Sequence, residues 1–589
     1  MAFRHRLPDG REYICRRPQV TGRRAMVASG HHLATQAGLR VLDRGGNAVD
    51  AGVAAGLCMS VLLTDMISFL GVAPIILYLA KERRVVTISG LGRWPRAVSI
   101  QWFREKWGGE IPPGVARCVV PAAADAWLTA LEKYGTMRFA DVAADAIELA
   151  GRGFPMHHFM HEHIAGARES YHRFPENRPV YFPDGDLVPV GAPVFHRDLA
   201  GTYERMARAE AKASSRPAGV RAARDEIYKG ETARRIVDFI QKNGGAMTLE
   251  DLAGFHVGEE PPVVSSYKGH EIHACGPWCQ GLTLPQALNL LERVDLRALG
   301  HNRPASLHAL FSAFDLTFAD RHAFLGDPEF VEVPAEGLLS KGYAAERAKL
   351  MERAEAFGGI PPAGDPWAFQ KGQKGNGRKA ADFNLKETAG AGAFEQDTSF
   401  CTAVDAGGNA FAATPSDGSG DVPIFPGVGA SVSGRGSQSW LDEAHPSSVQ
   451  PWKRPRLTPA PALVLKDGEF YMTLGTPGGD VQPQAMAQVF LNIAEFGMAP
   501  QMAVEAPRGA TFNFPNSFWP HEYKPGRAVV EQSIEREAGA ELRERGYKLD
   551  AWPDFGWRPG SVCCILRDPK TGFLLGGADP RRESYAAGW

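Results

Sequence analysis

The chain has 589 residues, a formal net charge of −2, 44% hydrophobic residues and 22% charged residues. This near-neutral globular balance provides no field that would attract nucleic acid or an anionic membrane, and no apolar run has the length of a membrane span. Residues 1–20 carry charge without the apolar core of a signal peptide, so the cytoplasm is the expected location. The eight cysteines are scattered, which favours reduced thiols over a disulfide framework.

The first two-thirds of the chain is predicted to be mainly helical. Residues 32–63 contain two apolar-periodic segments separated by Gly45, Gly46 and Asn47, which is the pattern of a helix that stops and a second that starts. Further helical segments are expected at 121–135, 139–154, 231–245 and 284–294. Residues 356–397 change to a composition rich in Gly, Lys and Ala with little periodicity, which is typical of a mobile surface linker.

The last third is predicted to contain three hairpins and one helix. The hairpins are expected at 399–414, 462–474 and 561–577, and the helix is expected at 480–496. Within the first hairpin, Gly408 and Asn409 are interpreted as turn residues. Side chains alternate along the strand 398–404, so that Thr398 and Phe400 share one face while Ser399 lies on the other.

Thr398 has two interpretations from its own sequence context. As an internal residue it is an ordinary strand residue, because threonine is enriched in strands. If instead its hydroxyl attacks the carbonyl of Asp397, the resulting ester hydrolyses and leaves Thr398 as a new N-terminus. The new α-amine, whose ordinary pKa is near ~8, then serves as the base for the hydroxyl of the same residue.

A series of ordered blocks runs along the sequence. The blocks are MVASGHHLATQAGLRVLDRGGNAVDAGVAAG (26–56), VVPAAADAWLTALEKYG (119–135), AIELAGRGFPM (146–156), YKGETARRIVDFIQKNGGAMTLEDLAGF (228–255), FADRHAFLGDPEFVEVP (318–334), DTSFCTAVDAGGNA (397–410), GTPGGD (475–480) and GGADPRRESYAAGW (576–589). Together they resemble the γ-glutamyltransferase family of N-terminal-nucleophile hydrolases. The resemblance implies an α/β fold, the αββα four-layer sandwich, in which hairpins of the last third pair with strands of the first part. It also implies a precursor cleaved between Asp397 and Thr398 into a large chain, 1–397, and a small chain, 398–589, which remain one folding unit.

The same resemblance implies the catalytic roles. Thr398 stands at the place of the processing and catalytic nucleophile, and Ser416 stands at the place of a second hydroxyl that supports it. Gly478 and Gly479 match the backbone donors of the oxyanion hole, a role that needs close backbone approach without a Cβ. The alternative for these two residues is an ordinary glycine turn between a strand and a helix. The resemblance implies no cofactor and no metal, and the histidine-rich stretch 157–163 is interpreted as a polar helix face or a lining of the substrate mouth.

The residues by which the family holds a γ-glutamyl group are mostly replaced. Leu91 stands where the resemblance places an arginine for the substrate carboxylate, and Arg93 is the nearest substitute, with a surface arginine as the alternative interpretation. The resemblance expects serine at two adjacent positions, and only one of them, Thr458, carries a hydroxyl here. Arg435 and Gln438 stand in the region where an acidic grip on the substrate amine is expected. A buried amine without a carboxylate partner is costly, so the pattern disfavours a γ-glutamyl substrate.

These features predict an autoprocessing amidohydrolase or acylase that cleaves a small non-γ-glutamyl amide through an acyl-enzyme on Thr398. The expected partners are a small-molecule amide and the two chains of the precursor, with pairing of two heterodimers, and neither nucleic acid nor membrane. Three alternatives remain open. They are a γ-glutamyl hydrolase or transpeptidase with a rearranged carboxylate clamp using Arg93, an unprocessed or inactive binding homologue, and lyase-like carbon–carbon cleavage on the same nucleophile.

Overall fold

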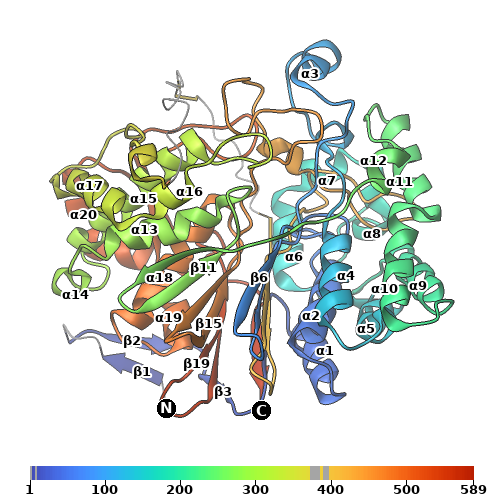
Figure 1. Ribbon diagram of the computed structural model, residues 1–589, viewed down its shortest axis with the longest axis horizontal. Helices are drawn as coiled ribbons and strands as arrows, with labels where there is room; N and C mark the ends of the chain where they lie inside the picture. Colours follow the sequence, from blue (N-terminus) through green and yellow to red (C-terminus); the bar gives the residue numbers. More distant parts are fainter. Residues whose placement is uncertain (1–2, 7–9, 372–384, 386, 389–396) are drawn as a thin grey trace.

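The computed structural model describes residues 3–6, 10–371, 385, 387–388 and 397–589. Two seven-stranded antiparallel sheets are stacked at its centre, and helices cover the outer face of each sheet (Figure 1). This arrangement is the predicted αββα sandwich. Most of the linker predicted at 356–397 lies outside the described residues.

The first sheet contains the strand that follows Thr398. In spatial order its strands are β21 (Tyr585–Gly588), β4 (Met26–Ser29), β12 (Cys401–Val404), β13 (Ala410–Ala413), β5 (Ile75–Leu79), β6 (Arg84–Ile88) and β9 (Glu259–Glu260). Strand β12 pairs on one side with β4 and on the other with its hairpin partner β13. Strands from before and after the Asp397–Thr398 bond therefore lie side by side in one sheet.

The second sheet also combines strands from before and after this bond. In spatial order it contains β10 (Val263–Tyr267), β11 (His270–Ala274), β14 (Ala462–Lys466), β15 (Glu469–Gly475), β19 (Cys563–Arg567), β20 (Leu574–Ala578) and β3 (Val20–Gly22). The three predicted hairpins are therefore present as β12–β13, β14–β15 and β19–β20.

The two faces of strand β12 enter different cores, as the alternation predicts. Phe400 and Val404 belong to the apolar core between the sheets, whereas Cys401 packs in the core shared with the helices. Thr402 Oγ1 donates a 2.7 Å hydrogen bond to Thr473 Oγ1 of β15, which ties the two sheets together. Strand β12, which follows Thr398 in the chain, is therefore packed on both of its faces.

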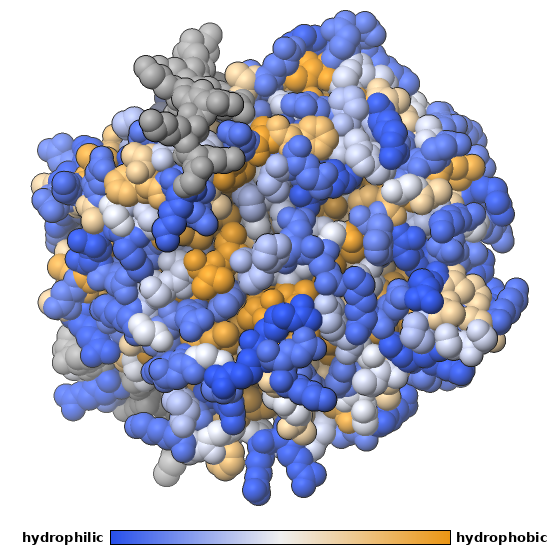
Figure 2. All heavy atoms as spheres, in the orientation of Figure 1, coloured by the Kyte–Doolittle hydropathy of each residue, from blue (hydrophilic) through white to orange (hydrophobic). Residues whose placement is uncertain are grey.

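Each helical layer has its own apolar core. One layer contains α1 (His32–Asp43), α2 (Ala48–Leu62), α4 (Ala123–Tyr134), α5 (Phe139–Arg152), α9 (Arg197–Glu210), α10 (Arg216–Tyr228) and α11 (Glu231–Lys242). The other contains α13 (Thr283–Leu291), α15 (Pro304–Phe324), α17 (Lys341–Ala348), α18 (Gln482–Ala494), α19 (Pro500–Glu505) and α20 (Gln532–Glu544). On the face seen in Figure 2 the surface is mostly hydrophilic, with hydrophobic residues gathered in its central part.

The predicted break between the first two helices has a local cause. Gly45 has a φ of 87°, which suits glycine, and Asn47 caps α2 by accepting hydrogen bonds from the N–H groups of Val49 and Asp50. The eight cysteines are all buried and unpaired. The described part of the chain contains no helix that is both long and apolar enough to cross a membrane.

Candidate active site

Thr398 lies buried just before β12, with its hydroxyl beside that of Ser416. Its N–H donates to the carbonyl of Met66 at 2.9 Å, and the N–H of Ser399 donates to the carbonyl of Pro415 at 3.0 Å. These two bonds place Thr398 Oγ1 2.6 Å from Ser416 Oγ. The structure thus brings together the predicted nucleophile and the predicted second hydroxyl, which are 18 positions apart in the chain.

The backbone of Thr398 is strained. Its φ is 113°, a region that residues with a Cβ rarely occupy and that is a genuine outlier for a β-branched side chain. Such a conformation costs on the order of 1–3 kcal/mol and persists only where the surroundings impose it. Cleavage of the Asp397–Thr398 peptide bond would release this strain, because Thr398 would then have a free amine in place of a constrained peptide.

The carboxylate of Asp397 is held by three donors. Arg435 Nη2 donates to Oδ1 at 2.5 Å, Ser416 Oγ donates to Oδ1 at 3.2 Å, and the N–H of Gly418 donates to Oδ2 at 3.0 Å. The guanidinium of Arg435 is buried and also pairs through Nε with Asp417 at 3.2 Å. Burial opposes its charged form, but the carboxylates of Asp397 and Asp417 outweigh that effect and raise the pKa of Arg435.

A second buried arginine, Arg582, contacts the other side of Thr398. Its Nη1 donates to the carbonyl of Thr398 at 3.1 Å, while Nε and Nη2 have no hydrogen-bond partner within the described residues. Burial lowers the pKa of Arg582 to about 10. A small cavity beside Thr398 is lined by this arginine together with Met66, Phe159 and Pro477. No local sequence pattern predicts this contact, because residues 582 and 398 are brought together only by the fold.

Gly478 and Gly479 form the turn between β15 and α18. Their φ values of 127° and 55° would strain any residue with a Cβ, which explains the choice of glycine. The carbonyl of Gly479 accepts from Gln280 Nε2 at 2.9 Å, and Asp480 is fixed by Arg321 and by Ser517 Oγ, the latter at 2.6 Å. No acceptor among the described residues bonds the N–H of either glycine. Pro477 of the same turn lines the Thr398 cavity, so the turn lies next to the predicted nucleophile.

Gln438 and Thr458 are hydrogen-bonded to each other and are connected to the glycine turn through Gln280. Gln438 Nε2 donates to Thr458 Oγ1 at 2.8 Å, and the N–H of Thr458 donates to Gln438 Oε1 at 3.2 Å. Gln280 Nε2 joins this pair to the turn, because it bonds the carbonyl of Thr458 at 2.8 Å as well as that of Gly479. Both residues therefore support the turn, and contact with a substrate stays a prediction.

Arg93 lies in an ion-pair cluster. Its Nη2 is 2.5 Å from Glu329, its Nη1 is 3.7 Å from Asp327, and Nη1 also bonds the carbonyl of Trp452 at 3.0 Å. These contacts occupy the guanidinium, and its role as a substrate ligand stays a prediction. Leu91 and Leu457, which stand at an arginine place and a serine place of the resemblance, are fully buried in one apolar cluster.

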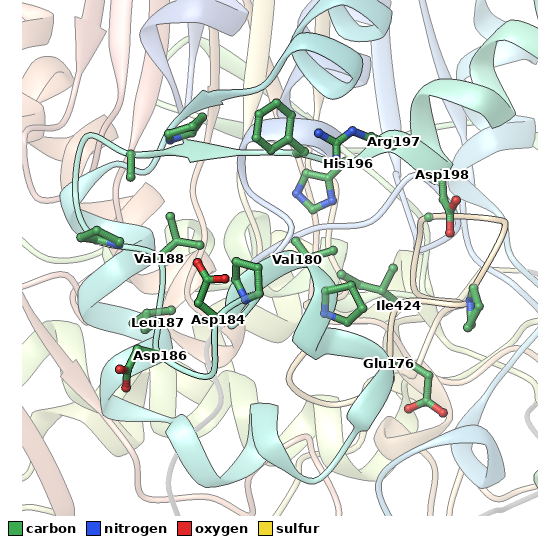
Figure 3. Close-up of a pocket in the computed structure, with 18 residues that line it drawn as sticks. Glu176, Val180, Asp184, Asp186, Leu187, Val188, His196, Arg197, Asp198 and Ile424 are labelled. Carbon is green, nitrogen blue, oxygen red and sulfur yellow. The ribbon is translucent and has the colours of Figure 1, made fainter.

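A larger pocket, of about 660 Å³, lies apart from these residues, between 176–198 and 424–429 (Figure 3). Its wall includes His196, whose Nε2 is 3.2 Å from Thr64 Oγ1. Burial lowers the pKa of His196 to about 4, so the imidazole is neutral at pH 7. None of the predicted site residues lines this pocket.

Comparisons with known proteins agree with the resemblance found in the sequence. Residues 34–589 match the gamma-glutamyltranspeptidase family model. The chain is 30% identical to the glutathione hydrolase-like YwrD proenzyme of Bacillus subtilis (strain 168), covering 97% of this chain and 99% of the relative. It is 29% identical to the acylase ACY 1 proenzyme of Pseudomonas sp. (strain SE83), with coverage of 97% and 95%. The crystal structure of cephalosporin acylase from Bacillus halodurans superposes with a TM-score of 0.82 at 27% identity, covering 99% of each chain.

Proposed function

The chain belongs to the gamma-glutamyltranspeptidase family of N-terminal-nucleophile enzymes, and from this premise we propose that it cleaves itself before Thr398 and then hydrolyses a small amide with Thr398 as nucleophile. The observation that carries the proposal is the contact of Thr398 Oγ1 with Ser416 Oγ at 2.6 Å in a strained backbone.

Self-cleavage uses the groups around the bond. Thr398 Oγ1 attacks the carbonyl carbon of Asp397, the carbon–nitrogen bond breaks, and the hydroxyl proton ends on the nitrogen, which becomes the α-amine of Thr398. Water then attacks the ester carbonyl, giving the C-terminal carboxylate of Asp397 and a free Thr398 hydroxyl. Arg435 donates to the Asp397 side chain, and Arg582 donates to the Thr398 carbonyl. These two hydrogen bonds position the residues on both sides of the Asp397–Thr398 peptide bond.

Turnover repeats this chemistry on an external amide. The α-amine of Thr398 takes the hydroxyl proton, Oγ1 attacks the amide carbonyl, and the N–H groups of Gly478 and Gly479 stabilise the oxyanion. The leaving amine departs with the proton, and water hydrolyses the ester to release the acid. The free N–H groups of the glycine turn and the anchoring of its carbonyl by Gln280 support this assignment.

A non-γ-glutamyl substrate is favoured by the replaced clamp. Leu91 and Leu457 provide no charge for the carboxylate of a γ-glutamyl group, and Arg93 is engaged by Glu329 and Asp327. The similarity to an acylase proenzyme and to a cephalosporin acylase points in the same direction. A γ-glutamyl hydrolase is the second candidate, because Arg435 lies near Thr398 and can hold a carboxylate.

Intact mass spectrometry of the purified protein tests self-cleavage. We expect two chains, ending at Asp397 and beginning at Thr398, and one 63.8 kDa chain for Thr398→Ala. Ser399→Ala is the matched control, because this neighbouring hydroxyl contacts Met59 Sδ and not Ser416. A single uncut wild-type chain after long incubation would instead support an inactive binding homologue.

A panel of acetyl, butyryl and γ-glutamyl p-nitroanilides tests the substrate assignment. Release of nitroaniline from the simple acyl compounds, absent in Thr398→Ala, is the expected result. Faster release from the γ-glutamyl compound would favour the second candidate. We also propose a cytoplasmic location and pairing of two heterodimers, which cell fractionation and light scattering would test.

A further inference from the structure

The larger pocket, between 176–198 and 424–429, has a mostly apolar wall and several carboxylates (Figure 3). Its volume of about 660 Å³ lies in the range of pockets that hold small molecules. The apolar part of the wall includes Pro179, Val180, Leu187, Val188, Ile424 and Pro426. The charged residues that line it are four acids and one base, namely Glu176, Asp184, Asp186, Asp198 and Arg197.

Two of the four carboxylates are without a partner. Asp186 lies 3.6 Å from a nitrogen of Arg168, and Asp198 accepts a hydrogen bond from a backbone N–H at 2.6 Å. The carboxylates of Glu176 and Asp184 form no ion pair and no side-chain hydrogen bond with any residue that the structure describes. Carboxylates in excess over cations give a cleft a negative potential, so this pocket favours a positively charged group over an anion.

A chain of hydrogen bonds determines which nitrogen of His196 carries the proton. Ser419 Oγ donates to the carbonyl of Thr64 at 2.8 Å, so it accepts from the hydroxyl of Tyr181 at 2.7 Å. Because each hydroxyl has one proton to donate, the Tyr181 oxygen accepts from Thr64 Oγ1 at 2.7 Å, and Thr64 Oγ1 accepts from His196 Nε2 at 3.2 Å. The ring is neutral, since burial lowers the pKa of His196 to about 4. Its single proton is therefore on Nε2, and Nδ1 is a bare acceptor.

This acceptor is buried without a donor. His196 is 2% exposed, and Nδ1 has no hydrogen-bond partner within the described residues. The imidazole belongs to the wall of the pocket, whereas Thr64, which holds its other nitrogen, does not. Figure 3 shows the ring extending from its backbone toward the middle of the lining residues. A buried acceptor that lacks a donor is costly, so the wall suits a molecule that brings an N–H or O–H group.

We propose that the larger pocket binds a small primary amine with an apolar body. The ammonium group supplies the donor that Nδ1 of His196 lacks and the positive charge that the carboxylates favour, and the apolar body covers wall residues such as Val180 and Ile424. An alcohol of the same shape supplies the donor alone, and a carboxylate supplies neither. None of these residues belongs to the proposed reaction, so the inference does not depend on the proposed function.

The test compares 2-phenylethylamine, 2-phenylethanol and phenylacetate by isothermal titration. The Thr398→Ala protein is used together with wild type, which separates binding from any turnover. We expect the amine to bind both proteins with a Kd at least about 10-fold lower than that of the alcohol, because a charged donor makes the stronger hydrogen bond. Phenylacetate should give no measurable heat. His196→Gln keeps an N–H donor for Thr64 and lacks Nδ1, so it should weaken amine binding by at least about 10-fold.

Asp184→Asn keeps the proposal testable if His196→Gln does not fold, because Asp184 is exposed. It should weaken amine binding by about 2- to 5-fold, as expected for an exposed charge, and leave alcohol binding unchanged. Asp467→Asn, an exposed carboxylate in the turn between β14 and β15, is the matched control and should not change amine binding. Absence of amine binding, equal affinity for amine and alcohol, or amine binding that both pocket variants leave unchanged would overturn the proposal.

Discussion

Removal of the Ser416 hydroxyl should slow both self-cleavage and turnover. This hydroxyl lies 2.6 Å from Thr398 Oγ1 and 3.2 Å from the Asp397 carboxylate, and Arg435 also bonds it. A hydrogen bond in a charged network contributes about 1.5–3 kcal/mol, so Ser416→Ala should reduce each rate by about 10- to 150-fold. KM should change little, because the lost contact orients the nucleophile and not the substrate.

The assay is the appearance of two chains on a denaturing gel over time, followed by kcat and KM on the processed fraction. Ser416→Thr should restore most of the rate, since it keeps the hydroxyl. Ser419→Ala is the matched control in the same loop, because its hydroxyl bonds Tyr181 and Thr64 and does not touch Thr398. The reasoning is refuted if Ser416→Ala cleaves within about threefold of wild type or if Ser419→Ala is equally slow.

Three further predictions concern the glycine turn, a buried acid and a helix cap. Gly478→Ala should lower kcat by about 100-fold through strain and a displaced N–H, whereas Gly497→Ala, at a φ of 68° in open space, should leave kcat unchanged in the anilide assay. Burial raises the pKa of Asp315 to about 7, so the native state holds this proton more tightly than the unfolded chain. The contribution of Asp315 to the free energy of unfolding should therefore fall by up to about 4 kcal/mol as pH rises from about 4 to about 7, and urea titrations should show wild type losing stability relative to Asp315→Asn over this range. Asn47→Ala should cost about 1 kcal/mol in the same titration, and an unchanged midpoint would contradict its capping role.

The three hairpins and helix α18 of the last third were predictable because their signals are local, and so was the start of α2 in the first part. Turn glycines and alternating side chains mark β12–β13, and Asn47 marks the start of α2. Strands β4 and β5 of the first part escaped prediction because they are buried on both faces. Strand β5, Ile75–Leu79, is apolar throughout and shows no alternation.

The candidate site was predictable only where the family resemblance reached it. Thr398 and Ser416 were placed by their offset, and the structure brings them together. Arg582 was not placed, because its contact with Thr398 spans 184 positions and leaves no local pattern. Arg93 lies two positions after Leu91, and an offset of two keeps the same face only within a strand, but β6 ends at Ile88 and the following backbone is irregular. The alternation rule does not apply there.

The interleaving of strands determines how the cut protein responds to dilution. Strand β4 of the proposed large chain lies between β12 and β21, the first and last strands of the proposed small chain, and is hydrogen-bonded to both. The carbonyl of the last residue, Trp589, accepts from the N–H groups of Arg23 and Arg24 at 2.8 and 2.7 Å. Two chains joined in this way cannot part without unfolding. Specific activity should therefore be the same at nanomolar and micromolar protein, although the proposed cleavage would make the enzyme formally a heterodimer.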